Sequence, residues 1–390
     1  MIDRAAFLQS LAAAAAVQAG PVPSERSFNL LVLGDSIAWG QGLKPEHRWR
    51  TLLVEHLQTA LRRPVREIPS EIHSGAIIGI GDRNEIDQPG LYQPGTQEVS
   101  FLDRGAYGGE IPSGTPTVLA ELDALDASPD RDTPIDLVVV SAGINDVRIT
   151  RLLDPLARDE YIAALVNLHC RRHLTVVLDR IRTRCVDRYP ACRVAVLSYF
   201  RIITQDSTKF PSVYDFVSAL LSQPPRSAAE RRRDRLIRGL AEAGEQVKPT
   251  PQAPTYAELP PVVKAMIGAA ERFYTESESA ISQAVDDANR APFTPAFTHV
   301  TPRIGAGQAV FVAPPDSPSL WEVRFEDRAV FPVDEVADQR EAICRSLYSP
   351  EKAAASLNEC RIASIGHPDV AGAEEGYFAA IFDAIASVVK

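Results

Sequence analysis

Cysteine is scarce in this chain, and its number is odd. Five cysteines in 390 residues do not form the dense disulfide framework of a small secreted domain. None of them has a C-x-x-C or a cysteine–histidine metal spacing, so the sequence predicts no structural zinc site. If the protein is exported, Cys185 could form a disulfide with Cys192, or Cys344 with Cys360; Cys170 would then have no partner.

Long hydrophobic runs and an excess of positive charge are also absent. No stretch of about 18 apolar residues occurs, so we expect no transmembrane helix and no stable membrane insertion. The 41 lysines and arginines are outnumbered by 51 aspartates and glutamates, and the net charge of −10 argues against nucleic acid as a partner. Hydrophobic residues make up 45% of the chain, which is enough for a sizeable core. The sequence leaves the oligomeric state open.

Residues 1–27 form an alanine-rich segment before the first predicted strand. Residues 5–19 have the length of the hydrophobic part of a signal peptide, but they are only weakly hydrophobic and follow an acidic residue, Asp3. With Arg4, the segment resembles a twin-arginine export signal that lacks its second arginine. Two interpretations stay open: an export signal, or a surface helix of a cytoplasmic protein.

The rest of the chain, residues 28–390, alternates short apolar runs with helical patterns. Such alternation is typical of βαβ units and predicts an α/β fold with a parallel sheet. The predicted strands are 28–33, 135–140 and 193–199, and the predicted helices are 47–62, 115–126, 158–189 and 371–388. In a parallel sheet, the loops that follow the strands lie along one edge, so we expect the functional residues there.

One long segment, residues 203–295, interrupts this alternation and is predicted to be a largely helical insertion. It contains a basic helical stretch at 226–238 and a long helix at about 262–289. The arginines of the basic stretch are interpreted as a solvated helix face rather than an anion-binding patch. Together with residues 314–321, the insertion is expected to wall the substrate pocket, and its helices suggest a lid over a bulky ester.

The first candidate for chemistry follows the first strand, where Gly34, Asp35 and Ser36 come in succession. A serine just past a strand, at the start of a helix, is exposed at the sheet edge and surrounded by free backbone N–H donors. Gly34 allows a sharp turn, and Asp35 can accept the backbone hydrogen bonds that brace it. Taken alone, these three letters fit an ordinary turn equally well.

Two further groups of polar residues have comparable positions. Gly143, Asn145 and Asp146 follow the strand at 135–140, and the Asn145 amide can donate to a developing oxyanion there. His367 precedes the C-terminal helix in a loop stiffened by Pro368, from where it can reach back over the sheet edge. A capping role for the asparagine remains an alternative.

A glycine that exposes its backbone N–H would complete such a site. Gly75, in Ser-Gly-Ala after the expected second strand, is preferred over Gly108 and Gly109, which also lie in an irregular glycine-rich stretch. His73, two residues earlier, is interpreted as structural, because a lone histidine motif has a high false-positive rate.

These groups together resemble the SGNH/GDSL hydrolase superfamily, whose blocks occur here in the family's order. The resemblance implies a flavodoxin-like three-layer α/β/α sandwich with strand order 2-1-3-4-5. It also implies a serine hydrolase without metal or organic cofactor. Ser36 would be the nucleophile, His367 the general base, and the Ser36 amide, Gly75 and Asn145 the oxyanion hole. The implied supporting residues are Asp35, Gly143, Asp146 and Ser364.

One position departs from the family pattern. The family usually has an aspartate three residues before its histidine, and this chain has Ser364 there. That aspartate orients the imidazole and stabilises its charged form. Some members use a backbone carbonyl instead, so we expect the carbonyl of Ser364 or Ile365 to accept the imidazole N–H. Asp369 is a less suitable substitute, because Pro368 turns it away.

The implied reaction is hydrolysis of a carboxylic ester, with a small-molecule or lipid ester as substrate. Two alternatives remain at this point. The protein could be a carbohydrate O-acetylesterase, since the same scaffold serves both activities, or a non-catalytic binding protein in which Ser364 is a first sign of decay. The presence of Ser36, Asn145 and His367 together argues against the last interpretation.

Overall fold

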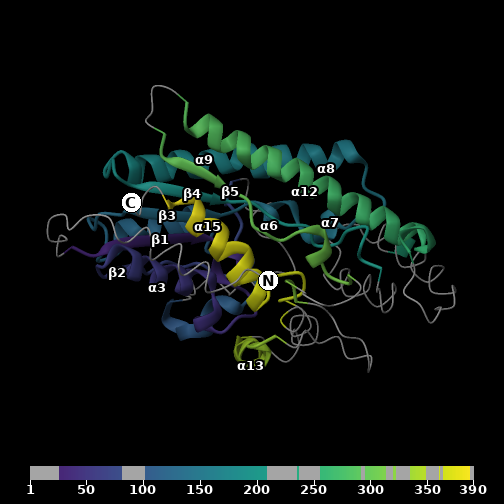
Figure 1. Ribbon diagram of the computed structural model, residues 1–390, viewed down its shortest axis with the longest axis horizontal. Coiled ribbons are helices and arrows are strands. Elements are labelled where there is room, and N and C mark those ends of the chain that lie inside the picture. Colours follow the sequence, from purple (N-terminus) through teal and green to yellow (C-terminus); the bar gives the residue numbers. More distant parts are fainter. Residues whose placement is uncertain are drawn as a thin grey trace.

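Five parallel strands form the centre of the protein (Figure 1). The computed structural model describes residues 26–80, 102–208, 235–236, 255–290, 295–312, 319–321, 334–347, 360 and 363–386. The strands are β1 (Phe28–Gly34), β2 (Val65–Ile68), β3 (Leu137–Ser141), β4 (Arg193–Leu197) and β5 (Phe297–Val300). Their order across the sheet is β2-β1-β3-β4-β5, which confirms the predicted topology.

The strands at the middle of the sheet are buried on both faces. Every residue of β1 and β3 is buried, and Leu31 pairs with Val138 while Val32 pairs with Val139. A continuous apolar run, rather than an alternating one, is what a parallel strand needs when helices cover both sides of the sheet. This explains why the sequence pattern predicted these strands clearly.

Helices cover the two faces (Figure 1). On one side lies a layer of packed helices next to the long helix α12, and on the other side α3 packs against the C-terminal helical segment. The first layer comprises α5 (Val118–Ala124), α8 (Asp159–Val166), the π-helical turns η4 (Asn167–His173) and η5 (Arg182–Val186), α9 (Leu174–Ile181) and α12 (Pro261–Ala288). The second comprises α3 (Trp49–Leu61), η8 (Gly372–Phe378) and α15 (Ala379–Ala384). All the predicted helices that fall on described residues are therefore confirmed.

Helix α12 connects β4 to β5 and belongs to this framework. Its buried face, which includes Met266, Phe273 and Ile281, packs along α8, η4 and α9. It therefore acts as a crossover helix between parallel strands, and the expectation that it forms part of a lid is wrong. Of the basic stretch at 226–238, only residues 235–236 are described, as a short piece of helix with exposed side chains; the rest of that prediction, and the domain boundaries, stay untested.

One of the two possible cysteine pairs is bonded. Cys344, in α13 (Ala337–Leu347), forms a disulfide with Cys360, whereas Cys170, Cys185 and Cys192 are buried free thiols. None of the helices in the described ranges has the length and apolar character that crossing a bilayer requires.

Candidate active site

The residues singled out by sequence meet at the carboxyl edge of the sheet. β1 ends at Gly34 and β3 ends at Ser141, so Asp35–Ser36 and the Gly143–Asp146 segment emerge side by side. Gly34 has a φ of +128°, and a Cβ there would lie 2.0 Å from the carbonyl oxygen of Ser141. Only glycine fits this contact, and the turn that begins there directs Ser36 into the first position of the short helix α2 (Ser36–Trp39).

Ser36 and His367 are in direct contact although 331 positions separate them. The imidazole Nε2 lies 2.8 Å from the Ser36 hydroxyl oxygen, a normal hydrogen-bond distance. The histidine loop is fixed by Trp321, whose N–H donates to the carbonyl of His367 at 2.8 Å and whose carbonyl accepts from the Gly366 N–H at 3.0 Å. The backbone thus holds the imidazole against the serine.

The other imidazole nitrogen, Nδ1, lies in an unusual environment. It is buried and forms no hydrogen bond of good geometry with a described residue, and the same is true of the Ser364 hydroxyl. Burial lowers the pKa of His367 to about 4, and the backbone carbonyls of Ser364 and Ile365 act against that shift. The imidazole is therefore neutral at pH 7, as a general base must be. The predicted carbonyl acceptor remains a prediction.

Asp35 braces the turn that presents Ser36. Its carboxylate accepts hydrogen bonds from the Ile37 N–H at 3.0 Å, the Ser141 hydroxyl at 2.9 Å and the Tyr199 hydroxyl at 3.1 Å. Burial raises the pKa of Asp35 to about 6, and these hydrogen bonds act against the shift. The Tyr199 hydroxyl oxygen also accepts the Ile144 N–H, so one network joins the ends of β1, β3 and β4.

Gly75 is placed so that only glycine fits. Its φ is +83°, and a Cβ would lie 2.8 Å from the backbone nitrogen and oxygen of Ser113. Gly109, the neighbouring alternative, instead packs against the ring of Trp39 and accepts the Ser74 N–H through its carbonyl. Glycine adopts this positive φ without the steric cost that a side chain would add, so the sequence choice at position 75 follows from the backbone conformation and from the close approach of Ser113.

Asn145 lies next to this glycine segment. Its side-chain Nδ2 donates to the Ala76 carbonyl at 3.0 Å, which fixes the amide and leaves its second N–H proton for another acceptor. Gly143 caps the short helix α6 (Ile144–Val147), and the Asp146 carboxylate accepts the Ile78 N–H. These bonds join the glycine and asparagine segments.

His73 is structural in its setting. It is fully buried, with Nδ1 2.8 Å from the Glu71 carbonyl and Nε2 3.1 Å from the Ser113 carbonyl. Burial lowers its pKa to about 4. Close to His73, the buried Glu121 carboxylate accepts the Gly34 N–H at 2.8 Å and so stabilises the turn before Ser36.

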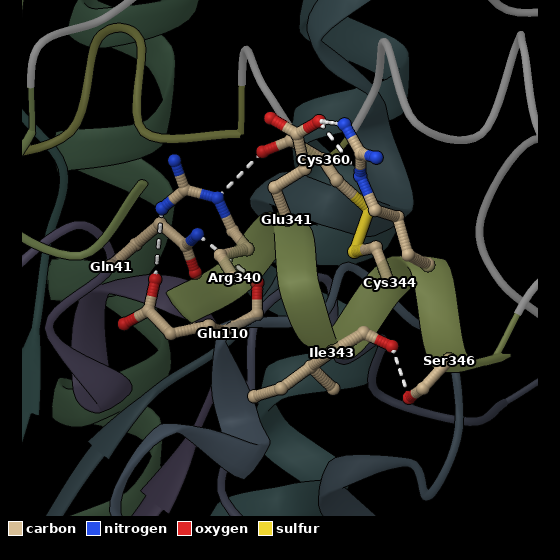
Figure 2. The surroundings of a disulfide bond; sticks show 9 residues. Gln41, Glu110, Arg340, Glu341, Ile343, Cys344, Ser346 and Cys360 are labelled. Atoms are coloured by element: carbon tan, nitrogen blue, oxygen red, sulfur yellow. Dashed lines mark hydrogen bonds and ion pairs between the residues drawn. A yellow bond between two sulfur atoms is a disulfide. The ribbon is translucent and has the colours of Figure 1, made fainter. Parts of the chain in front are cut away.

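A buried cluster of charged groups lies near the disulfide, and two of its members, Arg340 and Asp334, act electrostatically on His367 (Figure 2). Arg340 points from α13 toward Glu110, with its Nη1 3.0 Å from a Glu110 carboxylate oxygen, and it also contacts Asp334. Glu110 accepts the Gly42 N–H and the Trp39 indole N–H. Burial raises the pKa of Glu110, whereas Arg340 and then Arg48 act to lower it. The cluster joins the nucleophile helix to α13.

The arrangement agrees with a comparison against family models. The model of the GDSL-like lipase/acylhydrolase family matches residues 32–262. The chain belongs to this family. As a GDSL-like protein it is a hydrolase, and its α/β fold is the one expected from the blocks in its sequence.

Solved structures and curated proteins were also compared with this GDSL-like hydrolase. The extracellular lipase from Streptomyces rimosus is 15% identical, with 92% of this chain and 100% of that chain covered and a TM-score of 0.40. Phospholipase A1 from Streptomyces albidoflavus is 15% identical over the same shares, with a TM-score of 0.39. The aryl esterase of M. smegmatis is 16% identical over 70% and 84%, with a TM-score of 0.32. No curated protein matches.

Several residues around the site of this GDSL-like protein were missed from sequence. Tyr199 and Glu121 are fully buried polar groups that hold the nucleophile turn. Arg340 is also fully buried and binds the Cys360 carbonyl, Glu110 and Asp334. Tyr199 had a detectable signal, since it is the last residue of the strand predicted at 193–199, whereas β4 ends at Leu197 and leaves Tyr199 at the same sheet edge. Glu121 and Arg340 lie on helices among other charged residues and had none.

Proposed function

We propose that this hydrolase cleaves carboxylic esters, with Ser36 as nucleophile and His367 as general base. The observation that supports the proposal best is the 2.8 Å contact between the imidazole Nε2 and the serine hydroxyl. A nucleophilic serine needs a base at hydrogen-bond distance, in its neutral form, held in orientation by its surroundings. The short contact and the lowered pKa of His367 both fit this requirement.

The proposed reaction proceeds in two acyl-transfer steps. The Ser36 oxygen attacks the ester carbonyl while its proton moves to Nε2 of His367, and the imidazolium then gives that proton to the departing alcohol. A water molecule next attacks the carbonyl of the acyl-enzyme while His367 takes its proton; the bond to the Ser36 oxygen then breaks, the imidazolium returns the proton to that oxygen, and the acid is released.

The oxyanion would be held by three donors that face the same edge. The Ser36 N–H is at the first turn of α2, where helical backbone groups have no partner within the helix. The Gly75 N–H and the remaining Asn145 N–H proton complete the proposed set. Each such donor contributes about 10²–10³-fold to turnover in a comparable hydrolase.

The substrate we propose is a small-molecule or lipid ester, and the experiment is a chain-length series. Hydrolysis of p-nitrophenyl esters from acetate to palmitate is measured with wild type, Ser36→Ala and His367→Ala. Ser128→Ala, which removes a hydroxyl from a helix-terminal turn remote in sequence, and His56→Gln, on α3, serve as matched controls.

The proposal predicts turnover by wild type and both controls, with a loss of at least about 10³-fold in each active-site variant. A preference for longer chains would support a lipase-like substrate, and a strict preference for acetate would favour the O-acetylesterase alternative. If wild type is inert on every ester, or if Ser36→Ala retains wild-type activity, the proposal is wrong and a non-catalytic binding role takes its place.

A further inference from the structure

Three potential metal ligands converge behind the asparagine segment. Asp146 in α6 and two histidines of the π-helical turn η4, His169 and His173, offer ligand atoms that all lie within 4.8 Å of one another. The two imidazole rings are 5.0 Å apart between centroids. None of the steps proposed for ester hydrolysis uses the two histidines.

The spacing of the two histidines is that of a helical metal-binding pair. Residues four apart on a helix share one face, and paired histidines at this spacing bind zinc in other helices. π-helical turns are rare, and those found inside a longer α-helix frequently lie at functional sites. Here the π-helical turn contains both histidines and lies against Gly143. A Cβ added at Gly143 would be 3.5 Å from the His169 carbonyl oxygen.

Asp146 supplies a buried carboxylate to this group of ligands. Its two carboxylate oxygens lie 3.2 and 3.1 Å from the Ile78 backbone nitrogen. Within the described ranges it takes part in no ion pair, and the nearby buried Asp35 adds repulsion. Burial and, to a lesser extent, Asp35 raise the pKa of Asp146 to about 7. A buried carboxylate without a counter-charge is costly, and a bound cation would remove that cost.

His169 offers a buried ring nitrogen to the same group of ligands. Nδ1 of His169 is buried and forms no hydrogen bond with a described residue. Burial, then His173 and Arg151, lower the pKa of His169. Arg151 carries a positive charge that acts on His169 and opposes a cation at this position.

We propose that Asp146, His169 and His173 form a binding site for Zn²⁺. Two imidazoles and one carboxylate are a common protein ligand set for this ion, and water would complete a tetrahedral shell. Ligand atoms about 2.1 Å from zinc are about 3.4 Å apart in such a shell. To bind zinc, the ligand atoms of the three side chains must therefore come closer to one another by about 1 Å. Both histidines are half-buried, so their side chains can change rotamer by this amount. The ion would tie η4 to α6, directly behind Asn145.

The test is zinc binding by the full chain without an affinity tag and freed of metal. Zn²⁺ alone is titrated in competition with a chromophoric chelator, and Co²⁺ is titrated separately to record the absorption of a tetrahedral site. Wild type is compared with His169→Gln and His173→Gln, and with His56→Gln as a control on the opposite face of the sheet. Thermal unfolding without metal establishes that each variant is folded.

We expect one Zn²⁺ per chain in wild type and in the His56 control, and affinity at least about tenfold weaker in each η4 variant. Zinc should raise the melting temperature of wild type and leave that of the η4 variants unchanged. Arg151→Gln should bind zinc more tightly than wild type, since it removes the opposing charge. No stoichiometric binding by wild type, or equal binding by wild type and both η4 variants, would overturn the proposal. None of these measurements depends on whether the protein hydrolyses esters.

Discussion

Replacing Ser364 by aspartate tests how the imidazole of His367 is held. Both the Ser364 hydroxyl and Nδ1 of His367 are buried without a hydrogen bond of good geometry to a described residue, and the two residues are three positions apart in one turn. An aspartate is one atom longer and brings a charged acceptor to the unpaired nitrogen. We therefore expect Ser364→Asp to form the carboxylate–histidine pair that this sequence lacks.

The size of the effect follows from electrostatics. At a separation of about 4 Å and an effective dielectric constant of about 20, a carboxylate and an imidazolium attract each other by about 4 kcal/mol, or about 3 pKa units. Desolvation of the new carboxylate reduces this, so we expect the pKa of His367 to rise from about 4 by one to three units. Turnover at pH 8 should be unchanged or higher, with the roughly 10⁴-fold effect of a triad aspartate as an upper limit.

The assay is the pH dependence of kcat/KM on a p-nitrophenyl ester. In wild type, rate should be lost only as the pH falls toward about 4, where His367 takes up a proton. In Ser364→Asp this acidic limb should move to higher pH by one to three units, whereas Ser364→Asn, which has the same shape without the charge, should not move it. A folded Ser364→Asp protein with an unmoved limb, or with turnover reduced more than about tenfold, would refute this account of the histidine.

Three further substitutions test the surroundings of the site. Gly75→Ala must accommodate a Cβ 2.8 Å from backbone atoms of Ser113 at a φ of +83°. We therefore expect the unfolding free energy to fall by at least about 1–2 kcal/mol and kcat to fall by about 10²-fold. Wild-type values in urea unfolding and kinetics would contradict this. Arg340→Met leaves Glu110 and Asp334 buried without their cation, and should cost about 3–5 kcal/mol at pH 8. The cost should be smaller in acid, where Glu110, whose pKa burial raises, takes up a proton; urea unfolding at both pH values checks the difference. Cys360→Ser opens a bridge between residues 16 apart, and should lower the unfolding free energy by about 3 kcal/mol relative to oxidised wild type; equal melting temperatures would argue against a stabilising role.

The scaffold was predictable because its strands are buried on both faces. Runs such as Leu30–Leu33 and Leu137–Val140 leave no polar position, and this is a local property that the sequence shows directly. The strand order came from the resemblance to a known family rather than from the runs themselves. Helix α12 was predicted with nearly correct bounds, but its role was not, since periodicity does not say against which surface a helix packs.

The site was predictable where its residues follow strands, and not elsewhere. Ser36 and Asn145 lie directly beyond β1 and β3, so the parallel topology alone brings them to one edge. The contact between Arg340 and Glu110 spans 230 positions and depends on how α13 docks, which no local pattern encodes. The two histidines of η4 have a local spacing, but no local pattern joins them to Asp146 of α6, the third ligand of the proposed site.

The central claim is that Ser36 is activated by His367, and covalent labelling tests it most directly. Wild type, Ser36→Ala and His367→Ala are treated with a fluorophosphonate at pH 8, and the modified peptide is located by mass spectrometry. The account predicts one label, on Ser36, in wild type, none at that position in Ser36→Ala, and labelling slowed by at least about 10³-fold in His367→Ala. A label on another residue, or equally fast labelling without His367, would contradict it.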